Sequence, residues 1–310
     1  MKAMAMPEYG GADALTLMEL PEPKVAPGEV LVRVAAAGVN PVDWKLAAGG
    51  LDPIMVSHFP MVPGWDVAGV VTRNGLDSTE FAPGDEVIGY IRKDSAEHGG
   101  YAEQVAAQVR MLARKPRTLS WAQAAGLPLA GLTALQAADR VGAGAGDTVL
   151  VHAAAGGVGS LAVQILTARG ARVIGTASPA NHDFLRGLGA DPVAYGPGLA
   201  DRVRALAPEG VDAALDFVGG ESVDVSVDLL RSPDRLASVA DHRAAALGGH
   251  YVWVRPDGAG LTTLAALADE GRLTVFVEKV LPLREAAEAW RLNSEGHTRG
   301  KLVLSVGDGS

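Results

Sequence analysis

A glycine-rich segment at residues 149–159 carries the sharpest chemical signal in the sequence. It reads VLVHAAAGGVG, with Ala154, Gly156 and Gly159 at the spacing of the G-x-G-x-x-G dinucleotide fingerprint. Small residues let the backbone approach a pyrophosphate, and the N–H groups that begin a helix attract its charge. The alternative is a tight strand-to-helix turn without a ligand. Because a β–α series begins here, we expect this loop to bind a dinucleotide through Ala155, Gly156, Gly157, Val158 and Gly159.

The next expected strand, residues 172–177, bears on which nicotinamide is used. An NAD-binding chain usually carries Asp or Glu about 20 residues after the loop, where it holds the ribose 2′-OH. Here no acid lies at the strand end, and Asp183 comes later, inside the next helix. We therefore expect NADPH, with Ser178 and Asn181 donating hydrogen bonds to its 2′-phosphate, although no Lys or Arg lies at this turn. Alternatively, these two residues simply cap the helix.

Three further positions end expected parallel strands, and ligands bind at that edge of open α/β sheets. Val218, Ala240 and Val254 should contact the cofactor through shape and backbone. Tyr195 ends the third strand, where it could stack on or bond the adenosine 2′-phosphate end, or be an ordinary tyrosine at a sheet end.

The elements that position these residues fall into three segments. Residues 1–120 predict short strands, punctuated by Pro-Gly turns at 27–28, 63–64 and 83–84. Residues 121–271 predict alternating apolar strands and helices, which is typical of a doubly wound parallel sheet. Residues 272–310 return to mixed strand and helix character. The expected fold is α/β, with a nucleotide-binding domain inserted into a β-rich domain.

Composition excludes several function classes. The 310 residues include no cysteine, which excludes disulfides, Cys-ligated zinc, iron–sulfur clusters and thiol nucleophiles. The net charge of −9 disfavours nucleic acid and anionic membranes as partners. No run approaches 18 apolar residues, so we expect a soluble, cytoplasmic protein.

A series of motifs resembles one known family along nearly the whole chain. It comprises NPVDWK at 40–45, PGWDVAGVV at 63–71, GDEV at 84–87, GGYAE at 99–103, LAGLTA at 129–134, the glycine-rich loop, LDFVGG at 215–220 and HTRGKLV at 297–303. The series is similar to the zinc-independent quinone oxidoreductase branch of the medium-chain dehydrogenase/reductase superfamily. This resemblance implies a GroES-like domain that holds both termini and a Rossmann domain between them. It also implies hydride transfer from NADPH to a quinone or to the β-carbon of an α,β-unsaturated carbonyl.

The resemblance also bears on metal use. Asn40 stands where zinc alcohol dehydrogenases of the superfamily have a zinc-binding Cys, and Trp65-Asp66 replaces their usual His-Glu. The seven histidines show no ligand pair at helical or hairpin spacing. We therefore expect a metal-free active site, which suits acceptors that are already electrophilic.

Individual roles follow from the same resemblance. Asn40 and Thr133 are expected to act in catalysis and to contact the cofactor, and Lys301 to bind the cofactor. Alternatively, Asn40 is a turn residue, Thr133 is a helix cap and Lys301 is a solvated lysine. Trp44, Phe59 and Trp65 are expected to wall an apolar substrate pocket, or else to be plain core.

Other buried polar residues and competing functions complete the expectations. Asp43, Asp66 and His152 are expected to be structural, with buried hydrogen bonds, and the proton donor is Tyr90, His98 or solvent. An enoyl-thioester reductase of a biosynthetic pathway and a non-catalytic NADPH-binding protein are the alternative functions.

A short apolar run suggests an assembly. Residues 251–254 are expected to form a strand at the sheet edge, and pairing through such an edge predicts a homodimer.

Overall fold

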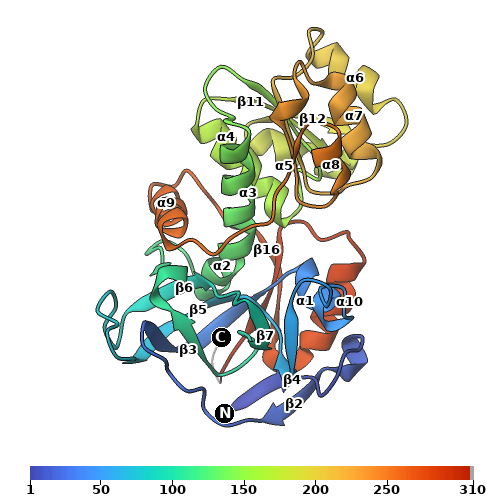
Figure 1. The fold of residues 1–310 in the computed structure, drawn as a ribbon. Coiled ribbons are helices and arrows are strands. Elements are labelled where there is room, and N and C mark those ends of the chain that lie inside the picture. Colours follow the sequence, from blue (N-terminus) through green and yellow to red (C-terminus); the bar gives the residue numbers. More distant parts are fainter. Residues whose placement is uncertain (308–310) are drawn as a thin grey trace. The chain divides into compact units, whose positions relative to one another are not determined.

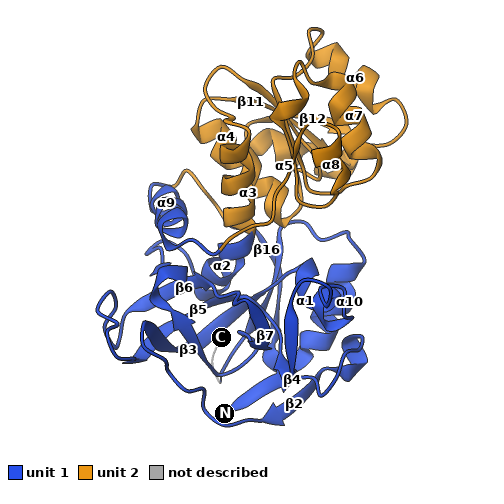
Figure 2. Ribbon diagram, viewed as in Figure 1, with its two compact units in different colours: residues 1–129, 256–270, 275–310 blue, residues 130–255, 271–274 orange. Residues whose placement is uncertain are grey.

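The structure, a computed structural model, describes residues 1–307 and divides them into two units (Figures 1 and 2). Unit 1 contains residues 1–129, 256–270 and the chain from 275 onward, so it holds both ends of the described chain. Unit 2 contains residues 130–255 and 271–274. The chain thus enters unit 2 once, returns, and visits it again briefly.

Unit 1 is built on a seven-stranded sheet in the order β16-β17-β3-β5-β6-β9, with β8 also paired to β3. Its centre is β3, an 11-residue strand whose residues are mostly buried Val, Ala and Leu, as a strand covered on both sides requires. The last strand β17 pairs antiparallel with β3, which places Leu302 opposite Val39. Residues more than 260 positions apart in sequence therefore lie side by side.

The elements of unit 1, in chain order, are β1 (Lys2–Ala5), β2 (Thr16–Glu19), β3 (Glu29–Val39), α1 (Pro41–Ala47), β4 (Val56–Val62), β5 (Asp66–Asn74), β6 (Glu86–Tyr90), β7 (Ser95–His98), β8 (Gln104–Gln108), β9 (Leu112–Arg114), α2 (Trp121–Gly126), α9 (Gly258–Asp269), β16 (Val277–Pro282), α10 (Ala286–Ser294) and β17 (Lys301–Ser305). Strands β1 and β2 form one small sheet, and β4 and β7 form another. Helix α2 begins after Ser120, whose hydroxyl accepts a hydrogen bond from the Gln123 N–H, as expected of an N-cap.

Unit 2 contains a parallel sheet in the order β12-β11-β10-β13-β14-β15. Its elements are β10 (Thr148–Val151), α4 (Gly157–Ala168), β11 (Arg172–Ala177), α5 (His182–Gly187), β12 (Ala190–Ala194), α6 (Leu199–Leu206), β13 (Ala213–Asp216), α7 (Glu221–Leu229), β14 (Leu236–Ser238), α8 (Arg243–Ala246) and β15 (His250–Tyr251). This strand order is that of a doubly wound dinucleotide-binding sheet. The predicted α/β fold class is confirmed.

One face of this sheet is covered by the helices α6 and α7. Alternate strand residues such as Leu150, Ile174 and Ala214 share a core cluster with Val203 of α6 and Val223 of α7. Successive strand side chains point to opposite faces, so the neighbours of these residues face the other way. The central residues of β10, β11, β13 and β14 are apolar because both faces of the sheet are buried there.

One sequence expectation and one alternative differ from the structure. The strand expected at residues 251–254 is wrong, because β15 ends at Tyr251 and Val254 is buried outside any strand. The alternative that Thr133 is a helix N-cap is also wrong, because α3 (Pro128–Arg140) already begins five residues earlier, at Pro128.

Helix α9 packs against β9 and β6 of unit 1, although its residues fall within the segment 121–271 expected to bind the nucleotide. The expected segments 1–120, 121–271 and 272–310 therefore follow the order of the chain, whereas the two units group the residues that pack together. Within residues 1–307, no helix is both long enough and apolar enough to cross a membrane.

Candidate active site and cofactor-binding edge

The glycine-rich loop of unit 2 is held close to the sheet by its own backbone. Ala153 has a left-handed φ of 52°, and its N–H donates to the Thr176 hydroxyl at 3.1 Å. The Ala154 N–H donates to the Thr176 carbonyl at 2.9 Å. A Cβ on Gly159 would lie 2.1 Å from the Ala153 carbonyl oxygen, so only glycine lets α4 start this close to the loop. Such a loop presents helix N-terminal N–H groups in the way a dinucleotide pyrophosphate requires.

The register of the next two strands brings two predicted cofactor residues to one place. Ala177 of β11 pairs with Ala194 of β12, so the residues that follow them, Ser178 and Tyr195, leave the same edge of the sheet. The Asn181 amide donates to the Ser178 hydroxyl at 3.3 Å. Neither Ser178 nor Asn181 makes a side-chain cap to its helix, so the capping alternative is not what the structure shows. Tyr195 is 65% exposed.

A cation near this edge escaped sequence reasoning, which considered only the turn after β11. Arg202, on α6, donates to the carbonyl oxygens of Ala194 at 3.0 Å and Pro197 at 2.9 Å. Its guanidinium also lies 3.4 Å from the Tyr195 carbonyl oxygen. A positive charge therefore supports the turn that carries Tyr195. The only available signal was an arginine eight residues after the strand.

The carboxylate of Asp216, at the end of β13, organises two neighbouring loops. It accepts hydrogen bonds from the N–H groups of Val218 and Gly219, at 3.1 and 3.0 Å. It also accepts from the hydroxyls of Ser222 and Ser238, each at 2.6 Å. These bonds hold the loops after β13 and β14, on which the exposed Val218 and the predicted contact Ala240 lie. The sequence indicated Asp216 only as part of a motif.

His152 lies buried directly after β10, as expected of a structural residue. Its Nε2 is 2.9 Å from the Ser226 hydroxyl oxygen, and that hydroxyl itself donates to the Ser222 carbonyl at 2.7 Å. Nε2 must therefore carry the hydrogen and donate it. Burial lowers the pKa of His152 to about 4, against the opposing effect of Asp216, so the ring is neutral near pH 7.

Unit 1 contains a buried polar network around Asn40, the residue between β3 and α1. The Lys301 ammonium donates to the Val39 carbonyl at 2.9 Å and to the Asn40 side-chain oxygen. The Asn40 amide donates to Asp66 at 2.9 Å, and the other oxygen of Asp66 accepts the Leu129 N–H at 2.7 Å. Asn40, Asp66 and Lys301 are each at most 5% exposed. In each of these hydrogen bonds one partner is an ionised group, which makes the bond about twice as strong as one between neutral groups.

Asp43 extends this network along α1. One of its oxygens accepts the Asn40 N–H at 2.8 Å and the Tyr101 hydroxyl at 2.9 Å. The Trp290 indole N–H donates to the Tyr101 hydroxyl at 3.3 Å. The other oxygen of Asp43 has no hydrogen-bond partner among the described residues. The expectation that Asp43 and Asp66 make buried hydrogen bonds is confirmed.

Burial dominates the ionisation of these groups. It raises the pKa of Asp43 to about 7, opposed by the hydrogen bonds from Asn40 and Tyr101. It raises the pKa of Asp66 to about 6, opposed by the charge of Lys301. It lowers the pKa of Lys301, opposed by the charges of Asp66 and Asp43. Near neutral pH the Asp66 carboxyl is therefore mostly ionised, and the Asp43 carboxyl is close to its midpoint.

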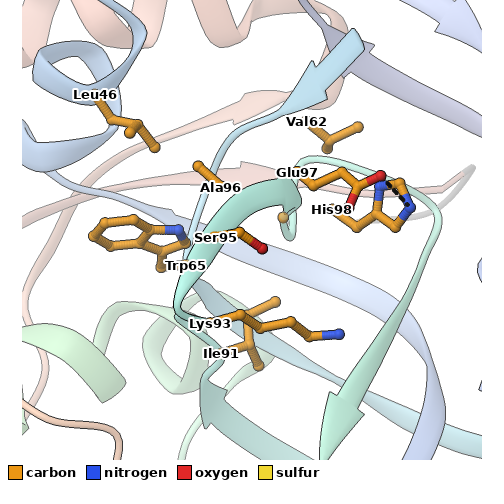
Figure 3. Close-up of a pocket in the computed structure, with 10 residues that line it drawn as sticks. Leu46, Val62, Trp65, Ile91, Lys93, Ser95, Ala96, Glu97 and His98 are labelled. Atoms are coloured by element: carbon orange, nitrogen blue, oxygen red, sulfur yellow. Dashed lines mark ion pairs between the residues drawn. The ribbon is translucent and has the colours of Figure 1, made fainter. Parts of the chain in front are cut away.

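A small cavity of about 40 Å³ lies between β4 and β7 in unit 1 (Figure 3). Its wall combines apolar side chains with a few polar ones: Leu46, Val62, Trp65, Ile91, Lys93, Ser95, Ala96, Glu97, His98 and Gly99. Trp65 is the one residue of the expected aromatic wall that lines it. Trp44 instead donates its indole N–H to Asn293, and Phe59 packs edge-on against Tyr9 with ring centres 5.0 Å apart.

The two candidate proton donors of unit 1 differ in environment. Tyr90 is buried, and burial raises its pKa well above the ordinary value, so its hydroxyl keeps its proton. His98 is half exposed and lies 3.5 Å from Glu97, an ion pair drawn in Figure 3. No group of three or more His, Asp or Glu side chains within residues 1–307 is arranged to hold a metal ion.

Comparison with known proteins gives this geometry a context. Residues 26–117 match the alcohol dehydrogenase GroES-like domain family, and residues 188–304 match the zinc-binding dehydrogenase family. The chain is 32% identical to the chloroplastic quinone-oxidoreductase QR1 of Triphysaria versicolor, covering 98% of both chains. It is also 32% identical to a chloroplastic NADPH-dependent alkenal/one oxidoreductase of Arabidopsis thaliana, covering 98% of this chain and 79% of the relative.

Solved structures agree. The quinone oxidoreductase from Coxiella burnetii superposes with a TM-score of 0.88 at 34% identity, over 99% of each chain. The CurK enoyl reductase superposes with a TM-score of 0.86 at 27% identity, again over 99% of each chain. The fold and the site define an oxidoreductase of a family that binds a nicotinamide cofactor. The chain belongs to the quinone oxidoreductase branch of the medium-chain dehydrogenase/reductase superfamily.

Proposed function

We propose that the protein is an NADPH-dependent reductase that transfers hydride to a quinone or an α,β-unsaturated carbonyl without a metal ion. The observation that carries the proposal is the glycine loop of unit 2, where a Cβ on Gly159 would lie 2.1 Å from the Ala153 carbonyl oxygen, so that only a glycine backbone leaves room for a dinucleotide to approach this closely. Residues 155–159, with Val218, Ala240 and Val254, would hold the cofactor there. Bound NADPH would supply the hydride.

The choice of NADPH rests on the residues after β11 and β12. Ser178, Asn181 and Tyr195 are uncharged hydrogen-bonding groups near the cation of Arg202, and no carboxylate follows β11. A 2′-phosphate is attracted to such a place, whereas the ribose of NADH would lack its usual carboxylate partner. Thr133 remains a proposed cofactor contact, through the resemblance alone, whereas the Lys301 ammonium is bonded to the Val39 carbonyl and to Asn40.

A carboxylate at this turn should reverse the preference. In Ser178→Asp, the new charge would repel the 2′-phosphate, and we expect the Kd of NADPH to rise about tenfold or more while that of NADH changes little. Cofactor fluorescence titration measures both constants. Ser294→Asp, which adds the same charge on exposed α10 of unit 1, is the control. An unchanged NADPH/NADH ratio in Ser178→Asp would remove the basis for the proposed specificity.

The acceptor side of the reaction is assigned to unit 1. Asn40 is a buried amide that can donate a hydrogen bond, and a donor aimed at the acceptor oxygen stabilises the negative charge that develops there as hydride arrives. In this way a side chain would do what a metal ion does in zinc enzymes. Trp65, which lines a small cavity of mixed polar and apolar residues, remains a proposed wall of the acceptor site through the resemblance alone.

The decisive experiment follows NADPH oxidation by absorbance with a panel of small quinones and alkenals. We expect turnover with NADPH that survives dialysis against a chelator. Turnover lost on chelation and restored by zinc would contradict the metal-free part of the proposal. Cofactor binding without turnover on any acceptor would instead favour a non-catalytic NADPH-binding protein.

An enoyl-thioester reductase is the second candidate, and the structural similarity to the CurK enoyl reductase favours it. The two acceptors differ in the group attached to the carbonyl carbon, since a thioester carries a long acyl-carrier arm that stays attached during reduction. Comparing kcat/KM for a short enoyl thioester with that for a quinone separates them. A ratio above one would make the thioester the better substrate class.

We also propose a homodimer, because β15 ends the sheet of unit 2 and leaves one strand edge without a strand partner among the described residues. The strand has only two residues, which makes this edge short. Size-exclusion chromatography with light scattering tests the assembly, and a monomer at micromolar concentration would contradict it.

A cytoplasmic location stays a prediction.

A further inference from the structure

We infer that Lys301 and Asp66 are positioning residues that lock the Asn40 amide in one orientation, so that its second N–H is the group that Asn40 offers to a ligand. The inference rests on the proposed function for its catalytic consequence, but its structural part stands on unit 1 alone. It assigns Lys301 a role through Asn40 rather than through direct contact with the cofactor.

The lock follows from the two charges on either side of the amide. The Asn40 side-chain oxygen accepts from the Lys301 ammonium, and its nitrogen donates to the Asp66 carboxylate at 2.9 Å. Turning the amide by half a rotation would place its NH₂ against the ammonium and its oxygen against the carboxylate. Both contacts would then be repulsive, in surroundings where all three side chains are at least 95% buried and water cannot screen the charges.

The partners of the lock are themselves fixed. Lys301 is also held by the Val39 carbonyl at 2.9 Å, and Asp66 by the Leu129 N–H at 2.7 Å. The backbone N–H of Asn40 donates to Asp43 at 2.8 Å, which holds the start of α1. Because both of its partners are held in place, the side-chain amide of Asn40 has little freedom to turn.

The lock determines what remains for a ligand. A side-chain amide has two N–H donors and an acceptor oxygen with two lone pairs. Asp66 takes one donor and Lys301 bonds to the oxygen, and the second N–H of Asn40 has no partner among the described residues. The group that Asn40 recognises through this N–H is consequently an acceptor, such as a carbonyl oxygen or a ribose hydroxyl oxygen.

Nuclear magnetic resonance tests the lock without any reaction. The chain has four asparagines, so selective ¹⁵N labelling gives four side-chain amide pairs, and Asn40→Ala assigns the relevant pair by its loss. In Lys301→Met we expect the Asn40 pair to shift and broaden. Lys115→Met is the matched control, because Lys115 is also largely buried in unit 1 but bonds to Glu86 and the Pro116 carbonyl. An unchanged Asn40 pair in Lys301→Met would overturn the inference.

Kinetics then tests the consequence. Removing the locked donor in Asn40→Ala should lower kcat about a hundredfold, and Lys301→Met about tenfold, with the Kd of NADPH changed less than about threefold. The double variant should be no slower than Asn40→Ala alone, because both changes remove the same interaction. Lys301→Gln, which keeps a donor, should recover part of the rate. Additive losses, or a raised Kd of NADPH with kcat intact, would show that Lys301 acts independently of Asn40.

The two readouts separate this inference from the proposed function. If the wild-type protein turns over no acceptor, the proposed function fails while the resonance of Asn40 still decides the lock. If turnover is present but Lys301→Met leaves both the resonance and kcat unchanged, the lock fails and the proposed function stands.

Discussion

The two units prepare their proposed binding sites by opposite means. In unit 2 the loop after β10 is built from alanine and glycine, and the contacts offered to a ligand come from backbone N–H groups and uncharged side chains. In unit 1 the site is a buried cluster of charges, with Lys301, Asp66 and Asp43 around a single amide. Close approach of the backbone governs the first, and electrostatics in a water-poor interior governs the second.

This difference predicts how each site fails. A larger side chain in the glycine loop of unit 2 acts through steric contact, and its effect should be weaker cofactor binding. In the buried charge network of unit 1, removing one partner leaves the remaining charge without compensation. The first effect should therefore be a lower free energy of unfolding.

The largest expected effect is therefore in unit 1. Asp66→Ala removes the carboxylate whose charge acts most strongly on Lys301, and it leaves the Leu129 N–H without an acceptor. We therefore expect a loss of about 3–5 kcal/mol in the free energy of unfolding. Urea denaturation at pH 7.5 measures it. Arg73→Ala, which breaks an ion pair with Glu22 whose side chains are about half exposed, is the control and should change stability little. Equal losses in the two variants would contradict the contrast.

The next effect concerns the cradle of unit 2. Gly159→Ala places a methyl group 2.1 Å from the Ala153 carbonyl oxygen, so α4 or the loop must move. We expect the Kd of NADPH to rise at least about tenfold and the protein to lose about 1–3 kcal/mol of stability. Fluorescence titration and thermal unfolding report the two losses.

A nearby glycine supplies the control for this variant. A Cβ on Gly144 would meet nothing within 4 Å, so Gly144→Ala should bind NADPH as the wild type does. If Gly159→Ala also bound the cofactor normally, the close approach of helix and loop would have no role in binding.

Sequence reasoning served these two regions unequally, for a physical reason. The cradle is local: strand, loop and helix are consecutive, so the pattern of residues 149–159 predicted both the structure and its candidate ligand. The unit 1 network joins Asn40 to Lys301 across 261 positions and Asp66 to Leu129 across 63. No local periodicity encodes such pairs. The sequence could place Asn40, but not show which way its amide points.

One error has the same origin. The apolar run at residues 251–254 predicted a strand, but only the Val252 N–H continues the pairing, to the Ser238 carbonyl, before the chain leaves the sheet. The alternative of a helix cap for Thr133 depended on where the helix begins, and α3 begins five residues earlier, at Pro128. The aromatic wall of a substrate pocket stays a prediction: Trp65 lines the cavity, whereas Trp44 and Phe59 make other contacts, since the direction of each side chain depends on tertiary packing.

A smaller effect compares how the units respond to pH. Burial raises the pKa of Asp43 from 3.8 to about 7, so its contribution to stability is fully present below pH 3.8 and is lost as the pH rises to about 7. Burial lowers the pKa of His152 from 6.5 to about 4, so its contribution is present above pH 6.5 and is lost as the pH falls through about 4. Acid thus favours the unit 1 network and opposes the unit 2 interior.

Two variants separate these contributions in urea unfolding between pH 4 and 7.5. Asp43→Asn should remove much of the decline in stability as the pH rises, leaving the weaker decline due to Asp66. His152→Gln, which can still donate toward Ser226, should remove the decline as the pH falls. Each difference from the wild type is expected to be on the order of 1–3 kcal/mol across this range. Parallel curves for wild type and either variant would show that the group does not titrate as its burial requires.

The smallest effect concerns the acceptor pocket and sharpens the contrast within unit 1. Trp65 is 5% exposed and lines the cavity, whereas Phe59 is 38% exposed and packs on Tyr9. Trp65→Phe removes apolar surface from the wall, so we expect KM for an apolar quinone to rise about threefold while the Kd of NADPH is unchanged, which corresponds to about 0.7 kcal/mol. Phe59→Leu should leave KM within error. A rise in KM for Phe59→Leu but not for Trp65→Phe would move the acceptor away from the cavity, toward the surface formed by Phe59 and Tyr9.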